Sequence, residues 1–292
     1  MDVRFFQLLP LAVIFAACTS VPEPVAVRQA IPSQPVALAP VGAPAVWPAE
    51  APAIYAQSAI LIDAHSGRVL YQKNADIPRP VASTQKLLTA LVVARDGDLD
   101  QIVQVARADT QVEPTKLGLR TGERYSRRHL LEAMLVKSCN DTAAALARDH
   151  SGSVPAFSAE MNQLAAQIGA TSSHFANPHG LPASQYSTAR DMARIAYRAY
   201  RIPALRVIMA RPVQPFVFNN GRVRYLENTN KLLKRSSLYT GMKTGYTDAA
   251  GRCLVTSASN GWRDLILVQL GSKTRYIFDD AERLIASAYS FR

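Results

Sequence analysis

The chain has 292 residues, 48% of them apolar, which is enough for one large globular unit or two small ones. Its 33 Lys and Arg residues against 22 Asp and Glu residues give a net charge of +11. This charge favours attraction to an anionic partner such as nucleic acid, lipid headgroups or cell wall. No Lys/Arg run and no basic stripe with interleaved aromatic residues is present, so nucleic acid is not expected as a partner, and simple solubility explains the charge equally well.

The cysteines and histidines do not form a metal-ligand pattern. Cys18, Cys139 and Cys253 lack zinc-ligand spacing, and three cysteines are too few for a disulfide framework. The five histidines are scattered, without a His-Glu-x-x-His pair. We therefore expect neither a metal nor another cofactor.

Residues 1–18 have the profile of a secretory signal. Arg4 precedes a short apolar run from Phe5 to Ala17, which is too short to span a membrane. The run ends at Phe15-Ala16-Ala17-Cys18, and small residues directly before a cysteine resemble the lipobox of bacterial lipoproteins. We expect Cys18 to be lipidated and to hold the protein to a membrane. An ordinary cleavage site beside an incidental cysteine is the alternative.

Residues 19–53 are predicted to form a disordered tether. The segment contains eight prolines among alanines and valines, and prolines this dense block both helix and sheet. In the polyproline conformation the segment would span on the order of 100 Å. Such a tether would let an anchored domain reach material held away from the membrane.

Residues 54–292 are predicted to form one unit of the α+β class. A hairpin is expected from 58–63 and 68–71 around Gly67, and a second pair of strands from 253–256 and 264–270 around the Asn260-Gly261 turn. Between and after them, apolar spacing predicts helices at 83–95, 129–137, 141–148, 155–169, 188–200 and 279–289. The economical arrangement is one antiparallel sheet built from both chain ends, with an inserted helical region.

Three short motifs occur in order along this unit. They are Ser83-Thr84-Gln85-Lys86, Ser138-Cys139-Asn140 and Lys243-Thr244-Gly245. The first two arise by chance in many proteins, and Lys-Thr-Gly is rarer but not decisive alone. The three in this order are a strong signal for a serine acyl-transfer site.

Ser83 and Lys86 are suited to nucleophilic catalysis. Ser83 begins a predicted helix and Lys86 follows one turn later on the same face, so the amine lies within reach of the hydroxyl. The amine must be uncharged to accept a proton, and both burial and neighbouring positive charge, from the helix end and Lys243, lower a lysine pKa. Taken alone, Ser83 would be interpreted as a helix N-cap.

The other two motifs are expected to line the same cleft. Ser138 and Asn140 fall in a break between two apolar helices, where an isolated turn would simply cap the next helix. Cys139 is predicted to be a small buried residue and not a nucleophile. Thr244 favours a strand, and Gly245 would let a substrate backbone lie alongside; a surface strand with a solvated Lys243 is the alternative.

From about Ala59 to Leu284 the chain resembles the low-molecular-mass penicillin-binding proteins, which are serine D-Ala-D-Ala carboxypeptidases and endopeptidases. The resemblance rests on the three motifs and on residues 61–70, 118–123, 177–181, 186–191 and 228–233. It implies the serine β-lactamase/DD-peptidase-like fold. It also implies an enzyme that hydrolyses D-Ala-D-Ala bonds, or D-Ala-diamino acid cross-links, of peptidoglycan through an acyl-enzyme on Ser83.

The resemblance implies a role for each motif residue. Lys86 would take the proton of Ser83, Ser138 would pass a proton to the leaving amine, and Asn140 would bond the amide of the substrate. Lys243 and Thr244 would meet the terminal carboxylate, beside Gly245. The backbone N–H groups of Ser83 and Tyr246 would form the oxyanion hole.

The expected partners follow from the same resemblance. They are the stem peptides of peptidoglycan, and β-lactam antibiotics as covalent inhibitors. The protein would be exported to the periplasm or cell envelope.

The chain departs from the family pattern in two places. The best-known members continue into a small β-domain and a C-terminal anchor, whereas this chain ends directly after its last predicted helix, and a lipid on Cys18 could replace that anchor. The family also often places an arginine before the last helix to hold the carboxylate. Lys273 and Arg275 are both candidates here, so carboxypeptidase and endopeptidase stay open.

Two other functions fit parts of the pattern. A class A β-lactamase shares the fold and the motifs but needs a glutamate after the Ser-x-Asn turn, and no acid between Asn140 and Lys243 lies in a Glu-x-x-x-Asn pattern. A non-catalytic wall-binding lipoprotein would keep the fold as a peptide-recognition module. The complete set of catalytic groups argues against it.

Overall fold

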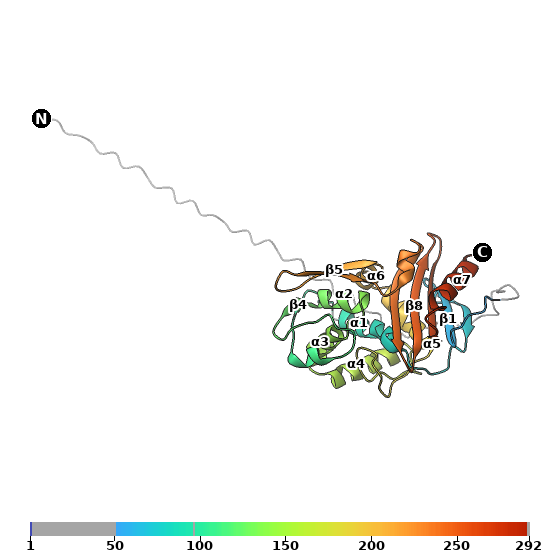
Figure 1. Ribbon diagram of the computed structural model, residues 1–292, viewed down its shortest axis with the longest axis horizontal. Coiled ribbons are helices and arrows are strands. Elements are labelled where there is room, and N and C mark those ends of the chain that lie inside the picture. The colour runs from blue at the N-terminus through green and yellow to red at the C-terminus, as the bar shows by residue number, and fades with distance from the viewer. Residues whose placement is uncertain (2–50, 96, 291–292) are drawn as a thin grey trace.

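The computed structural model describes Met1 and residues 51–95 and 97–290 (Figure 1). The strands are β1 (Ser58–Asp63), β2 (Val69–Lys73), β3 (Ile102–Gln104), β4 (Arg124–Ser126), β5 (Val213–Val217), β6 (Val223–Glu227), β7 (Tyr239–Thr247), β8 (Gly251–Ser259) and β9 (Asp264–Ser272). The α-helices are α1 (Lys86–Arg95), α2 (Arg127–Val136), α3 (Asn140–Ser151), α4 (Val154–Gln167), α5 (Ala189–Tyr200), α6 (Pro203–Met209) and α7 (Ile277–Tyr289). Short 3-10 helices are η1 (Ala82–Gln85), η2 (Arg107–Gln111) and η3 (Lys231–Lys234). The predicted signal peptide after Met1, with Cys18, and all but the last three residues of the tether lie outside the described residues.

One five-stranded sheet unites the two ends of the described chain. Its order is β2-β1-β9-β8-β7, and each neighbouring pair is antiparallel. β1 and β2 precede the helical region in sequence, whereas β7, β8 and β9 follow it. The predicted α+β class, with one antiparallel sheet assembled from both ends, is therefore confirmed.

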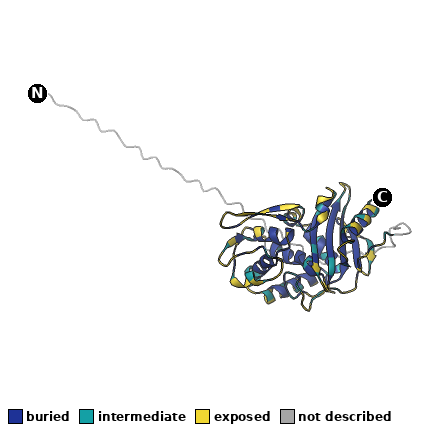
Figure 2. Cartoon of the chain, in the orientation of Figure 1, coloured by how far each residue is buried: buried dark blue, intermediate teal, exposed yellow. Residues whose placement is uncertain are grey.

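The sheet is buried on both faces. Successive side chains of a strand point to opposite faces, so Ile60 and Ile62 of β1 join the core shared with the helices, while Ala59 and Leu61 join a second core under α7. Figure 2 shows the central strands of the sheet mostly in dark blue, the colour of buried residues. The two apolar layers explain why most residues of the central strands β8 and β9 are buried.

Helix α1 lies at the centre of the helical region. Every residue from Lys86 to Ala94 is buried, and the helix contacts α2, α3, α4, α5 and β7. Its first residue therefore lies at the junction between the helical region and the sheet. Within the described part of the chain, no helix is long and apolar enough to cross a membrane.

Several elements differ from the sequence-based expectation. Residues 83–85 belong to the 3-10 helix η1, and the α-helix begins only at Lys86. The small hairpins β3–β4 and β5–β6 and the helix α6 were not predicted, because three to seven residues are too few for a clear period. The two main strand pairs and the six predicted helices occur where expected, within a few residues at their ends.

Candidate active site

Ser83 and Lys86 form the centre of the site. The Lys86 Nζ lies 2.9 Å from the Ser83 Oγ, because η1 leads directly into α1 and places the two side chains on one side. The same amine donates to Asn140 Oδ1 and to the His179 carbonyl oxygen, each at 2.6 Å. Lys86 is thus held by three oxygen atoms, none of which belongs to a carboxylate.

The surroundings of Lys86 favour its uncharged form. Complete burial, reinforced by the positive charge of Lys243, holds the pKa of Lys86 well below its usual value of 10.5. Burial also lowers the pKa of Lys243 to about 7. An amine of lowered pKa beside a serine hydroxyl can act as a general base at neutral pH.

The loop 177–181 covers one side of this pair. The His179 carbonyl accepts from both Lys86 and the Ser83 hydroxyl, the latter at 3.2 Å. Gly180 has a φ of +85°, and a Cβ there would lie 2.2 Å from the Ala82 carbonyl oxygen, so only glycine fits. Burial and the charge of Lys86 lower the pKa of His179 to about 3, which keeps its ring neutral.

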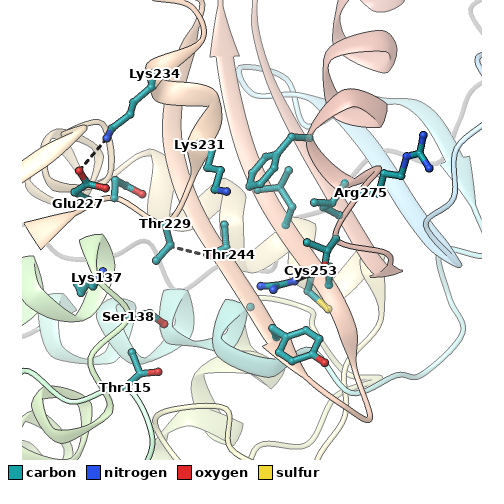
Figure 3. Close-up of a pocket in the computed structure, with 18 of the residues that line it drawn as sticks. Thr115, Lys137, Ser138, Glu227, Thr229, Lys231, Lys234, Thr244, Cys253 and Arg275 are labelled. Carbon is teal, nitrogen blue, oxygen red and sulfur yellow. Dashed lines mark hydrogen bonds and ion pairs between the residues drawn. The ribbon is translucent and has the colours of Figure 1, made fainter.

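Ser138 and Asn140 lie in the break between α2 and α3. Ser138 has a φ of 71°, a conformation that ends α2 and turns the chain sharply. Figure 3 shows its side chain facing the groove beside Thr115. Asn140 turns inward instead: its Oδ1 accepts from Lys86, and its Nδ2 donates to the Pro114 carbonyl.

Asp141 fixes this turn from behind. The fully buried carboxylate accepts from the backbone N–H groups of Leu117, Gly118 and Leu119, at 2.9, 2.9 and 3.3 Å, and from that of Thr142 at 3.0 Å. It therefore ties the loop 117–119 to the start of α3, next to Asn140. The family-like stretch 118–123 has a structural role that the sequence did not reveal.

The Lys-Thr-Gly motif lies on β7, as expected for a strand. Lys243 is completely buried and donates to the Thr244 carbonyl at 2.8 Å, so a solvated surface lysine is excluded. Thr244 faces the groove, and its Oγ1 donates to Thr229 Oγ1 at 2.7 Å (Figure 3). Gly245 lies against the chain's own backbone: a Cβ there would be 2.8 Å from Ser83 N.

A groove of about 900 Å³ runs along β7 beside these residues (Figure 3). Its lining includes Ser138, Thr229, Thr244, Gly245 and Tyr246. It also contains basic residues that the motifs did not predict, namely Lys137, Lys231, Lys234, Arg235 and Arg252. The groove can thus accept an extended, negatively charged peptide along Gly245, which itself lies against the backbone of Ser83.

Further expectations concern Cys139, the two candidates for binding the carboxylate, and metal ligands. Cys139 is buried, and burial raises the pKa of its thiol to about 12, which makes it an unreactive core residue as predicted. Of the two candidates for the carboxylate, Arg275 lines the groove and lies over the ring of Tyr276, while Lys273 is not among the lining residues. Among the described residues, no group of three or more His, Cys, Asp or Glu side chains could hold a metal ion.

The fold and the contact of Ser83 with Lys86 are those expected of a serine hydrolase. A sequence model of the D-alanyl-D-alanine carboxypeptidases matches residues 46–274. The chain belongs to this family and is a serine D,D-peptidase that acts on peptidoglycan.

Individual relatives include both carboxypeptidases and endopeptidases. The D-alanyl-D-alanine carboxypeptidase DacB2 of Mycobacterium tuberculosis is 38% identical over 218 residues, which are 74% of this chain and 74% of the relative. A D-alanyl-D-alanine endopeptidase of Escherichia coli is 31% identical over 264 residues, 89% of this chain and 84% of the relative. The crystal structure of a D-alanyl-D-alanine carboxypeptidase from M. tuberculosis superposes with a TM-score of 0.79 at 34% identity, covering 89% and 96% of the two chains. The penicillin-binding D,D-peptidase family and its fold, inferred from the motifs, are confirmed.

Proposed function

We propose that Ser83 is the nucleophile and Lys86 the general base of this peptidase. The main supporting observation is the contact of the Lys86 amine with the Ser83 hydroxyl at 2.9 Å, in a site where burial and the charge of Lys243 lower the pKa of Lys86 more than the charge of Asp141 raises it. The Ser83 Oγ adds to the carbonyl carbon of the penultimate D-alanine, and its proton passes to Lys86 Nζ. The oxyanion formed accepts from the backbone N–H groups of Ser83 and Tyr246.

The remaining motif residues complete the reaction. The C–N bond breaks as the leaving amine takes a proton through Ser138, and an acyl-enzyme on Ser83 remains. Water then adds to this ester. Lys86 passes a proton from the water to the Ser83 Oγ, and the acyl peptide is released. Thr244 faces the carboxylate of the leaving group, while Asn140 orients Lys86 and the substrate amide. Buried Lys243 acts through its charge on Lys86.

Acylation by a fluorescent penicillin tests this assignment. A β-lactam offers a strained amide in place of the substrate amide, so wild-type protein should form a covalent band. Ser83→Ala should abolish the band, and Lys86→Met should reduce its rate of formation by at least about a hundredfold. Cys139→Ala is the matched control and should label normally, because the Cys139 thiol is buried and protonated.

Two outcomes would contradict the proposal. A band that persists in Ser83→Ala would assign the nucleophile elsewhere. Rapid, repeated turnover of penicillin by the wild-type protein would favour a β-lactamase, and a wild-type protein that never labels would favour a wall-binding module.

We further propose that the protein is exported and held to a membrane by a lipid on Cys18, with residues 19–53 as the tether. Small residues before Cys18 and the proline-rich spacer support this proposal. Cys18→Ser should release the protein from the membrane fraction of cells and abolish incorporation of radiolabelled palmitate. Cys253→Ser serves as the control. Wild-type protein without incorporated palmitate would contradict the lipid anchor.

A further inference from the structure

The groove beside β7 carries more positive charge than a single carboxylate requires. Six basic residues line it against one acid, Glu227. Lys234 pairs with Glu227 at 3.2 Å, and Arg235 pairs with Asp279 and Glu282. The other four have no ion pair with any described acid: Lys137, Lys231, Arg252 and Arg275.

Arg252 of β8 is oriented in advance for an anionic ligand. It lies opposite Tyr246 in the β7–β8 register, and its guanidinium lies 4.3 Å from the centre of the Tyr246 ring. Its Nε donates to Thr274 Oγ1 at 3.0 Å, so one donor of the planar group is used and the terminal nitrogens stay available. A guanidinium fixed in this way can donate from its two terminal nitrogens to the two oxygens of a carboxylate.

Lys231 supplies a second cation across the groove. It is the first residue of η3, and Figure 3 shows its side chain extending toward Thr244. The neighbouring Thr229 is bonded to Thr244, which brings the start of η3 close to the Lys-Thr-Gly strand. Thr244 is therefore flanked by Lys231 on one side and by the Tyr246–Arg252 pair further along the strand.

We propose that Lys231 and Arg252 bind two separate carboxylates of the leaving group, and that the enzyme therefore prefers a leaving group with two carboxylates over free D-alanine. This inference rests on the proposed function, in which the leaving group lies along Thr244. The preferred substrate class would be a cross-link between two stem peptides. The leaving group of such a cross-link carries one carboxylate on the diamino acid, beside the amine that is released, and a second carboxylate at the end of its stem. The hydrolytic step itself is unchanged.

Matched peptides separate charge from size. Diacetyl-L-Lys-D-Ala-D-Glu and diacetyl-L-Lys-D-Ala-D-Gln differ by one carboxylate at nearly constant shape, and diacetyl-L-Lys-D-Ala-D-Ala is the small reference. We expect kcat/KM for the D-Glu peptide to exceed that for the D-Gln peptide by about tenfold at low salt, with a smaller ratio at high salt. Arg252→Met should bring this ratio down to about 1, and Lys231→Met should also reduce it. Lys234→Met is the matched control, because Lys234 is already paired with Glu227, and it should keep the wild-type ratio.

The same peptides also serve as competitors of fluorescent-penicillin labelling, so the charge preference is measured independently of turnover. Equal use of the D-Glu and D-Gln peptides, and equal competition by them, would overturn the inference. A wild-type ratio retained in Arg252→Met and Lys231→Met would overturn the residue assignment. Failure of labelling by penicillin would instead contradict the proposed function.

Discussion

Gly245 of β7 lies directly against the backbone nitrogen of Ser83. A Cβ on Gly245 would be 2.8 Å from that nitrogen and 3.0 Å from both Ala82 Cβ and Thr84 N. Side-chain carbons do not approach backbone atoms so closely, so any other residue would separate the strand from η1. The contact brings the backbone of Ser83 beside that of Tyr246, as the proposed oxyanion hole requires.

Gly245→Ala is therefore expected to impair acylation more than folding. Displacement of Ser83 from β7 by a few tenths of an ångström or more should lower the second-order rate of penicillin acylation by about a hundredfold. Gly221→Ala is the control: Gly221 has a φ of +79° but open space around it, so this change should cost about 1 kcal/mol of stability and leave acylation unchanged. Wild-type acylation in Gly245→Ala would show that the close contact is dispensable.

The rate of acylation should rise with pH as Lys86 loses its proton. Because burial and the charge of Lys243 lower the pKa of Lys86, the rise should be complete well below pH 10.5. Lys243→Met removes a positive charge, which makes the ammonium form of Lys86 less unfavourable and raises its pKa. In Lys243→Met, the pH at which the acylation rate rises should therefore be higher than in the wild type, as a pH profile of the rate would show. Lys73→Met, a change on β2, should leave the profile in place, and an unshifted profile in Lys243→Met would contradict the electrostatic coupling.

Lys243 should also make the folding stability depend on pH. Its pKa is about 7 when folded and near 10.5 when unfolded, so the unfolded state binds the extra proton between these values. The resulting destabilisation is complete below about pH 7 and disappears above pH 10.5. Relative to wild type, Lys243→Met should therefore be more stable at pH 7 than at pH 10, by a few kcal/mol at most. Chemical denaturation at several pH values measures this difference, and a constant difference would refute it.

Asp141→Asn should destabilise the protein even though Asp141 does not touch the catalytic pair. Its buried carboxylate accepts four backbone N–H groups, and the amide offers one acceptor oxygen in place of two. We expect a loss of about 2–3 kcal/mol in the free energy of unfolding. Asp98→Asn affects a carboxylate that accepts two N–H groups on an exposed turn and should cost less than about 0.5 kcal/mol. Equal losses in the two variants would contradict the role of the buried carboxylate.

Local patterns in the sequence were sufficient for most of the fold. The apolar runs of β1 and β9 and the spacing of α5 identify elements whose side chains are sorted by burial, and burial is visible in sequence as periodicity. The three-residue strands β3 and β4 carry no such period, and Pro215 interrupts the pattern of β5. These elements are defined by their partners and not by their own residues.

The contacts within the catalytic site also fall into two groups, those that the sequence predicts and those that only the tertiary structure reveals. The contact of Ser83 with Lys86 joins residues three positions apart, so helical spacing predicts it. The contacts of Lys86 with Asn140 and with the His179 carbonyl join residues 54 and 93 positions apart. Only the packing of α1 against α3 and the loop 177–181 brings those oxygens to the amine, and a backbone carbonyl has no signature in a sequence motif.

The reactive groups, their order and the local elements on which they lie can all be identified in the amino-acid sequence alone. The protonation of Lys86 depends on the packing of distant segments, because burial and charges such as that of Lys243 set the pKa of an amine. The same packing brings together the cations that line the groove. Arg252 and Lys231 come from β8 and η3, and both line the groove because the strands pair and η3 packs on β7.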